Sequence, residues 1–203
     1  MIRAARQEDV LRLTIDRTDK ANSLTREMLG ELADHVARAG DAKVLILTGE
    51  GPVFSAGADM AEAKAGLAVD PVWERLSGAI AAFDGLSIAA LNGTLAGGAF
   101  GMALACDLRI AVPSAKFFYP VMRLGFLPQP SDPARMAALI GPARTKLILM
   151  AGQKIDAPEA LAMGLIDRIV PHDDFAAVLG DLTRDVIAAA PQQIAGIKRM
   201  TGQ

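Results

Sequence analysis

The stretch SIAALNGTLAGGAFGMALACDLRIAV, residues 87–112, carries a strand, a turn, a helix and a second strand in one run. Residues 87–93 are almost continuously apolar, which predicts a strand buried on both faces. Two adjacent glycines then precede a run with helical spacing over 98–106, and residues 108–112 are apolar enough for a further strand. Because a helix can return the chain to a parallel strand, this order predicts an α/β protein.

The same order of elements occurs earlier in the chain. KVLILTG (43–49) predicts a second buried strand, followed by a Gly/Ser/Ala loop over 51–60 and the start of a helix. This recurrence of strand–loop–helix units indicates a loosely spaced structural repeat. The remaining expected strands are a half-buried one over 11–15 and short ones over 116–120 and near 165–170. The remaining expected helices run from Thr25 to Gly40 and over 71–83, 173–189 and 191–200. Between Pro128 and the last two helices we expect mostly helix, broken at Gly141-Pro142 and Pro158.

Composition sets the broad class of the protein. The chain has 203 residues, 52% of them hydrophobic, which favours one globular domain with a buried core. A formal net charge of -2 provides no basic field, which argues against a nucleic-acid partner. The single cysteine can form no internal disulfide, and neither a secretory signal nor a run of about 18 apolar residues is apparent. We therefore expect a cytoplasmic protein with no membrane partner.

Motifs for nucleotide binding and for serine hydrolases are incomplete. LTGEGPVF (47–54) lacks the third glycine of the dinucleotide fingerprint. GTLAGGAF (93–100) has Ala99-Phe100 where a P-loop requires Lys and Ser or Thr. The chain contains no GxSxG motif, which disfavours an α/β-hydrolase.

The residues most often used for metal binding or nucleophilic attack are few and scattered. His35 and His172 are the only histidines and lack ligand-like spacing, so we predict surface or helix-end positions for both and no metal site. Cys106 follows an apolar helix with no histidine near it in sequence, which predicts a buried small residue rather than a nucleophile.

Two glycine- and alanine-rich loops remain as candidates for binding. FSAGADM (54–60) and LAGGAFG (95–101) each follow a buried strand and precede a helix. Main-chain N–H groups at a helix start lack partners and lie at the positive end of the helix dipole. Two such loops side by side can direct two N–H groups at one oxygen, forming an oxyanion hole. The alternative is that both loops are simply tight strand–helix turns.

Several further segments fit one family together with these loops, in order along the chain. They are DKANSLTREMLGEL (19–32), KVLILTGEGPVFSAGADM (43–60), LNGTLAGGAFGMALACDLRIA (91–111), AKFFYPVMRLGFLP (115–128) and ALIGPARTKLILMAGQKIDAPEALAMGLIDRIVP (138–171). In these segments the chain resembles the crotonase superfamily, the enoyl-CoA hydratase/isomerase family. The resemblance implies a spiral of ββα units, with two roughly perpendicular sheets flanked by helices. It implies a single domain over 1–203, with a spiral core over 1–170 and a shortened C-terminal helical part over 171–203.

The resemblance also assigns roles to the two loops. It implies that the N–H groups of Ala58 and Gly98 form the oxyanion hole for a thioester carbonyl and stabilise an enolate-like oxygen. It implies an acyl-CoA ligand, no tightly bound cofactor apart from the coenzyme A of the substrate, and a homotrimer or hexamer. The implied coenzyme A contacts are Lys20, Ala21, Ser23, Leu24, Ala56, Ala58, Asp59, Met60, Gly97 and Gly98, with Lys20, Arg17 or Lys64 facing the phosphates.

The sequence departs from the family where its hydratases place acids. By this resemblance, Gly101 and Val121 stand at the positions of the two hydratase glutamates, and Gln129 at a third acidic position used by some members. Hydration needs both a base and an acid, so we expect little ordinary hydratase activity. Asp132 is the candidate substitute, with an N-cap before Pro133 as its alternative role, and Tyr119 is assigned to the core or the pocket rim.

Two functions therefore stay open from the sequence. One is an enzyme that acts on a CoA thioester through an enolate, by isomerisation, decarboxylation or thioester hydrolysis, with a non-standard acid or base. Decarboxylation is attractive because loss of CO₂ forms the enolate without a protein base. The other is a non-catalytic acyl-CoA-binding sensor or carrier that keeps the oxyanion hole.

Overall fold

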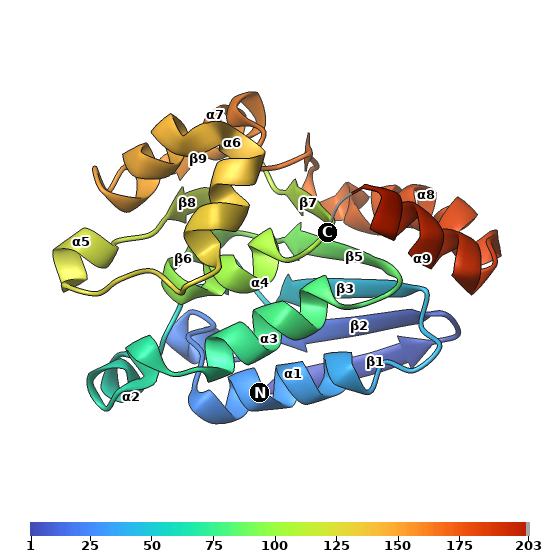
Figure 1. The fold of residues 1–203 in the computed structure, drawn as a ribbon, viewed down its shortest axis with the longest axis horizontal. Coiled ribbons are helices and arrows are strands. Elements are labelled where there is room, and N and C mark those ends of the chain that lie inside the picture. The colour runs from blue at the N-terminus through green and yellow to red at the C-terminus, as the bar shows by residue number, and fades with distance from the viewer. Residues whose placement is uncertain (202–203) are drawn as a thin grey trace.

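The computed structural model describes residues 1–201 and contains two sheets flanked by helices (Figure 1). The larger sheet has the strand order β1-β2-β3-β5-β7-β10, and the smaller has the order β4-β6-β8-β9. The strands of the larger sheet are β1 (Ile2–Gln7), β2 (Val10–Ile15), β3 (Val44–Gly49), β5 (Leu86–Leu91), β7 (Leu108–Ala111) and β10 (Arg168–Ile169). Those of the smaller are β4 (Val53–Ser55), β6 (Thr94–Ala96), β8 (Lys116–Phe118) and β9 (Ile155–Asp156).

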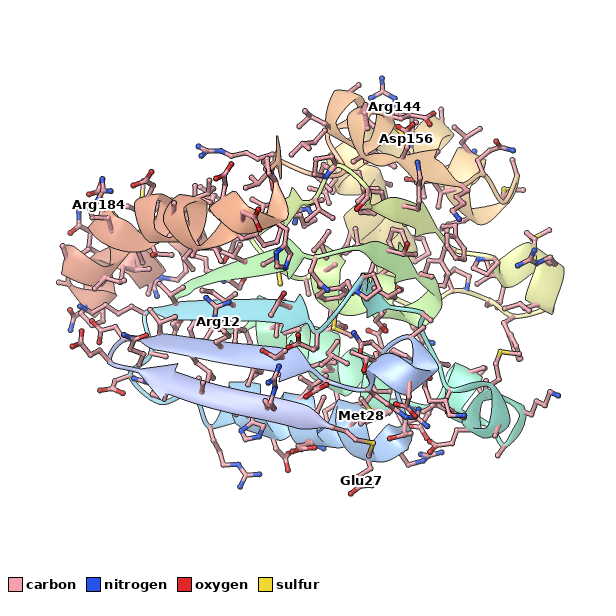
Figure 2. All side chains as sticks on the ribbon, turned by 180° about the vertical axis from the view of Figure 1, so that it is seen from behind. Arg12, Glu27, Met28, Arg144, Asp156 and Arg184 are labelled. Atoms are coloured by element: carbon pink, nitrogen blue, oxygen red, sulfur yellow. The ribbon has the colours of Figure 1, made fainter. Side chains whose placement is uncertain are left out.

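The helices lie around these sheets. They are α1 (Arg26–Ala37), α2 (Met60–Lys64), α3 (Val72–Ala81), α4 (Phe100–Leu104), α5 (Val121–Leu124), α6 (Asp132–Leu149), α7 (Ala157–Met163), α8 (Phe175–Ala188) and α9 (Pro191–Met200). Helices α1 and α3 pack together over one face of the larger sheet, and the view from behind shows the strands in front of them (Figure 2). Within residues 1–201, no helix has the length and apolar character needed to cross a lipid bilayer.

The chain repeats a strand–strand–helix unit that spans both sheets. Strand β3 is followed by β4 and α2, β5 by β6 and α4, and β7 by β8 and α5. The pairs β3–β5, β5–β7, β4–β6 and β6–β8 are all parallel, so equivalent ends of the units lie at one edge. The predicted α/β class with two sheets is confirmed, and the repeat places the loop after β4 beside the loop after β6.

The side chain of Asn92 ties two consecutive repeats together. Asn92 follows β5, and its Oδ1 accepts a hydrogen bond from the Gly49 N–H at 2.8 Å. Its Nδ2 donates to the Gly51 carbonyl at 2.6 Å. Because the buried amide uses both of its ends, it fixes the junction of β3 with β4 against the junction of β5 with β6.

Several elements differ from the sequence-based expectation. Strand β4 lies inside the loop expected over 51–60, and the short elements β6, α5 and β9 were not expected. Strand β1 was not predicted, because it is an edge strand with only Ile2 buried and therefore shows no alternation. The helix expected over 98–106 is a 3-10 turn, η3 (Gly97–Ala99), followed by the shorter helix α4. Gly141 interrupts α6 with a φ of 78°, as predicted, whereas Pro158 breaks no helix and lies in the first turn of α7.

Candidate active site

The first candidate loop connects β4 to α2. Its main chain forms a parallel bridge to Leu24, in which the Leu24 N–H donates to the Gly57 carbonyl at 2.7 Å and the Asp59 N–H donates to the Leu24 carbonyl at 2.8 Å. In a parallel bridge of this kind the residue between the two bonded groups turns its own N–H to the other side. The Ala58 N–H is therefore directed away from Leu24.

The second candidate loop connects β6 to α4 through η3. Gly98 is the second residue of this turn, and the first N–H groups of a helix have no intrahelical acceptor. A Cβ at Gly98 would lie 3.2 Å from ring atoms of Trp73. Trp73 is itself buried and held by a 2.8 Å hydrogen bond from its Nε1 to the Leu67 carbonyl. The position therefore suits glycine, since a side chain there would press against a fixed ring.

The two loops touch each other through their main chains. Gly57 has a φ of 91°, and a Cβ placed on it would lie 2.8 Å from the Ala96 carbonyl oxygen and 3.3 Å from the Gly97 Cα. Only glycine at position 57 permits both the backbone angle and this approach. The structure thus brings Ala58 and Gly98 to adjacent loops, the arrangement that the family resemblance implies.

Both loops border one cavity of about 310 Å³. Apolar side chains from α3, α5 and the segment after α5 form much of its wall, and Lys64 stands at it as a cation. The lining residues are Ala56, Ala58, Met60, Ala63, Lys64, Ala68, Trp73, Ala96, Gly97, Gly98, Phe118, Tyr119, Pro120, Val121, Leu124, Phe126, Leu127 and Gln129. An apolar cavity beside two helix starts is a site for a ligand with an apolar body and an electron-rich oxygen.

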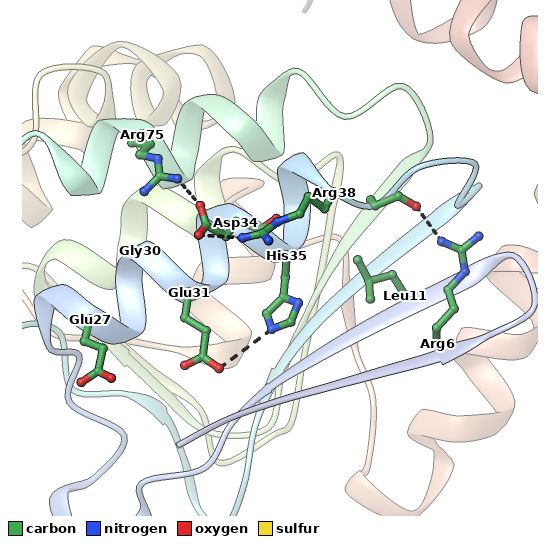
Figure 3. Close-up of a pocket in the computed structure, with 10 residues that line it drawn as sticks. Arg6, Leu11, Glu27, Gly30, Glu31, Asp34, His35, Arg38 and Arg75 are labelled. Carbon is green, nitrogen blue, oxygen red and sulfur yellow. Dashed lines mark hydrogen bonds and ion pairs between the residues drawn. The ribbon is translucent and has the colours of Figure 1, made fainter.

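A larger hollow of about 670 Å³ lies over α1, at the side of β1 and β2 (Figure 3). Several of its charged groups are engaged with one another: Asp34 pairs with both Arg38 and Arg75. His35 belongs to this surface and faces Glu31 (Figure 3). Among the described residues that line this hollow, no two helix N-termini meet. It therefore lacks the paired main-chain N–H groups of the smaller cavity and is the weaker candidate despite its size.

The predicted coenzyme A contacts separate into two groups. Ala56, Ala58, Met60, Gly97 and Gly98 line the cavity, whereas Lys20, Ala21, Ser23, Leu24 and Asp59 lie in neighbouring segments outside its lining. Asp59 caps α2 by accepting from the Ala61 N–H at 3.0 Å. A 2.8 Å hydrogen bond from Arg17 holds the pKa of Asp59 below its usual range. Arg17 is thereby committed to Asp59, which leaves Lys20 and Lys64 as the candidate phosphate contacts.

Asp132 is not the N-cap that one interpretation of the sequence proposed. It lies inside the first turn of α6, fully buried, and its Oδ2 accepts a 2.9 Å hydrogen bond from Tyr119. Ser131 is the N-cap residue instead, and its N–H and hydroxyl donate to Glu74 of α3. Within the described chain Asp132 Oδ1 has no hydrogen-bond partner, and burial raises the pKa of Asp132 to about 7.

The histidines and the cysteine take the positions predicted for them. His35 is partly exposed on α1 and His172 is largely exposed, so both are surface residues. Cys106 is buried, its Sγ donates to the Met102 carbonyl at 3.3 Å, and burial raises its thiol pKa to about 12. A thiol in that state is inert at neutral pH.

Comparison with known proteins decides the family. The family model described as enoyl-CoA hydratase/isomerase matches residues 5–201. The chain belongs to the enoyl-CoA hydratase/isomerase family. It is 33% identical over 203 residues to the carnitinyl-CoA dehydratase of Citrobacter koseri, covering 96% of this chain and 77% of that protein.

Solved structures of the family have the same fold. An enoyl-CoA hydratase from Mycobacterium avium subsp. paratuberculosis has a TM-score of 0.88 and 29% identity, with 97% of this chain and 82% of that chain covered. A Thermobifida fusca protein in complex with acetoacetyl-CoA has a TM-score of 0.90 and 27% identity, with 98% and 85% covered. Members of the enoyl-CoA hydratase/isomerase family act on CoA thioesters, so the cavity beside the two loops is the place to look for a thioester site.

The carboxylate of Asp132 lies against Gly101, one turn into the helical segment after the double glycine. A Cβ at Gly101 would be 2.9 Å from Asp132 Oδ1. The position at which the family resemblance places an acid is thus glycine, and an acid from a different helix occupies the space beside it. Sequence reasoning named both residues but missed their contact. The signal available was a glycine at 101 together with the Asp-Pro pair that begins at 132.

Replacing Gly101 with alanine tests this contact. We expect Gly101→Ala to lower the free energy of unfolding by about 1–3 kcal/mol, because the new methyl group displaces the Asp132 carboxylate. In an Asp132→Ala background the obstacle is gone, so the same change should cost nothing. Urea unfolding of the four proteins measures the coupling, and equal costs in both backgrounds would show that the two residues do not meet.

Proposed function

We propose that this protein binds an acyl-CoA thioester and stabilises its enolate with the N–H groups of Ala58 and Gly98. The observation that carries the proposal is the main-chain contact of the two loops at one cavity, which only Gly57 permits. An enolate concentrates negative charge on the former thioester oxygen. Two N–H groups fixed beforehand stabilise that charge without reorganising, and one such donor is typically worth about 3 kcal/mol.

The ligand fits the chemistry of the cavity wall. The apolar lining suits an acyl chain, and Lys64 at the cavity suits a phosphate or the polar part of coenzyme A. Lys20 is the second proposed phosphate contact. The complex of the Thermobifida fusca relative with acetoacetyl-CoA supports this ligand class.

The acidic side chains available near the cavity limit the class of reaction. Gly101, Val121 and Gln129 supply no acid, and Asp132 is the proposed proton-transfer group. Each proton-transfer group contributes about 10²–10⁴ in rate, so hydration without a second group is expected to be slow. Isomerisation can use one group for both proton transfers, and decarboxylation forms the enolate without a protein base. These two reactions are the proposed activity, with thioester hydrolysis as a third candidate.

One panel of measurements tests the proposed function. Calorimetry with butyryl-CoA and free coenzyme A measures binding, and product analysis with enoyl-, malonyl- and 3-hydroxyacyl-CoA measures turnover. We expect the thioester to bind more tightly than free coenzyme A, and at least one substrate to turn over. Thioester binding with no turnover supports the non-catalytic carrier instead, and hydration of crotonyl-CoA at the rate of a two-glutamate hydratase contradicts the assigned reaction class.

The assembly is a second expectation that follows from family membership. We expect a homotrimer or hexamer, and several apolar side chains beside the cavity are exposed in the single chain, among them Met122 and Leu127. Light scattering on the purified protein measures the mass, and a monomer at micromolar concentration contradicts this expectation.

A further inference from the structure

The geometry points to Tyr119 as the group that transfers protons between a bound thioester and Asp132. This inference rests on the proposed function and adds to it the route by which a buried acid reaches the substrate. The need for a route arises because Asp132 is fully buried and, within the described chain, is not among the residues that line the cavity. It cannot touch a ligand itself.

Tyr119 connects the two places. It lines the cavity, and its hydroxyl donates to Asp132 Oδ2 at 2.9 Å. The same hydroxyl oxygen accepts from the Gln129 main-chain N–H at 3.3 Å, and the ring stacks on Phe100 with centroids 5.4 Å apart. These contacts fix both the ring and the direction of its proton.

The surroundings of Tyr119 and Asp132 favour the passage of a proton through a neutral tyrosine over formation of a tyrosinate. Burial and the neighbouring Asp132 raise the pKa of Tyr119, so the phenol stays neutral. Asp132 is affected by Glu74 from α3, which favours its proton, and by Arg135 from α6, which favours its ionised form. With a pKa of about 7, the carboxyl both releases and takes up a proton near neutral pH.

The unpartnered oxygen of Asp132 is the second observation. Asp132 Oδ1 is buried without a hydrogen-bond partner in the described chain and lies close to Gly101, where a Cβ would be 2.9 Å from it. A purely structural polar pair in a core is normally satisfied at every atom, because a bare buried acceptor costs about 1–3 kcal/mol. A carboxyl retained at that cost fits a group kept for its chemistry.

The step balances as a two-proton shift. The bond between hydrogen and the α-carbon breaks, and that proton joins Tyr119 Oη while the phenol proton moves to Asp132 Oδ2. The electron pair of the broken bond becomes the enolate, whose charge rests on the thioester oxygen near the N–H groups of Ala58 and Gly98. Tyr119 ends neutral, Asp132 ends protonated, and the reverse shift returns a proton to carbon.

The test is α-proton exchange of butyryl-CoA in D₂O, followed by mass spectrometry. We expect Tyr119→Phe and Asp132→Asn each to slow exchange by about 10²-fold, and the double variant to be no slower than either, because the two act as one unit. Wild-type exchange should rise with pH through about 7, as Asp132 ionises, and Asp132→Asn should lose that rise. Thr183→Val removes another buried hydroxyl, in α8, and should leave exchange unchanged.

Calorimetry with the same ligand separates the outcomes. If Tyr119→Phe binds butyryl-CoA normally and still exchanges at the wild-type rate, the transfer role is overturned while the proposed function stands. If the wild-type protein binds but does not exchange, the transfer role is overturned and thioester binding stands. If the wild-type protein does not bind the thioester, the proposed function fails and the transfer role fails with it.

Discussion

Ala58→Pro should slow α-proton exchange of an acyl-CoA by about 10²–10³-fold, because it deletes one of two proposed donors to the enolate oxygen. The bridge to Leu24 uses the Gly57 carbonyl and the Asp59 N–H, so the lost N–H serves no hydrogen bond in that bridge. Proline at this place therefore removes a functional donor while the bridge keeps its two bonds.

Ala58→Gly is the matched control for this change. It removes a methyl group and keeps the N–H, so exchange should stay within about threefold of the wild type. Thermal unfolding of both variants shows whether the loop still folds. A well-folded Ala58→Pro protein with wild-type exchange would remove Ala58 from the site.

Asp132→Asn should change the pH dependence of stability by a large amount. Burial raises the folded-state pKa of Asp132 from 3.8 to about 7, so the folded protein keeps a proton that the unfolded chain releases. The stability due to this group is full below about pH 4, falls as pH rises, and is lost above about pH 7. The whole change corresponds to at most about 4 kcal/mol.

Unfolding free energies of the two proteins from pH 4.5 to 8 measure this effect. The asparagine variant cannot titrate at this position, so over this pH range its stability relative to the wild type should rise by about 3 kcal/mol. Burying an amide without hydrogen-bond partners has a cost that does not depend on pH. That cost cancels when the stability difference between the two proteins is compared from one pH to another. A difference that does not vary with pH would mean that Asp132 is ionised throughout, which contradicts its assigned environment.

Much of the framework was predictable from local sequence. The apolar runs over 43–49 and 87–93 become β3 and β5, because both are buried on both faces and so carry no polar alternation. The glycine-rich loops after them could be predicted as neighbours, since parallel repeats align equivalent ends. Strand β1 could not be predicted, because an exposed edge strand has no apolar pattern to detect.

The environment of Asp132 depends on contacts between distant segments and was not predictable in the same way. An Asp before Pro is a common helix start, and the N-cap interpretation followed from that pattern alone. In the structure Ser131 is the N-cap residue and binds Glu74, which is far away in sequence, while Asp132 turns inward to Tyr119 and Gly101. The pattern of residues within one helix does not predict which side chains of another helix it will contact, and here the contact joins α4 to α6.

The proposed oxyanion hole consists of two N–H groups that converge on one thioester oxygen, and infrared spectroscopy measures that interaction directly. Butyryl-CoA labelled with ¹³C at the carbonyl gives a stretch that moves to lower frequency when hydrogen bonds polarise the bond. We predict a downward shift on binding to the wild-type protein, a smaller shift with Ala58→Pro, and the full shift with Ala58→Gly. A saturated complex in which the wild-type protein leaves the carbonyl frequency unchanged would contradict the oxyanion hole.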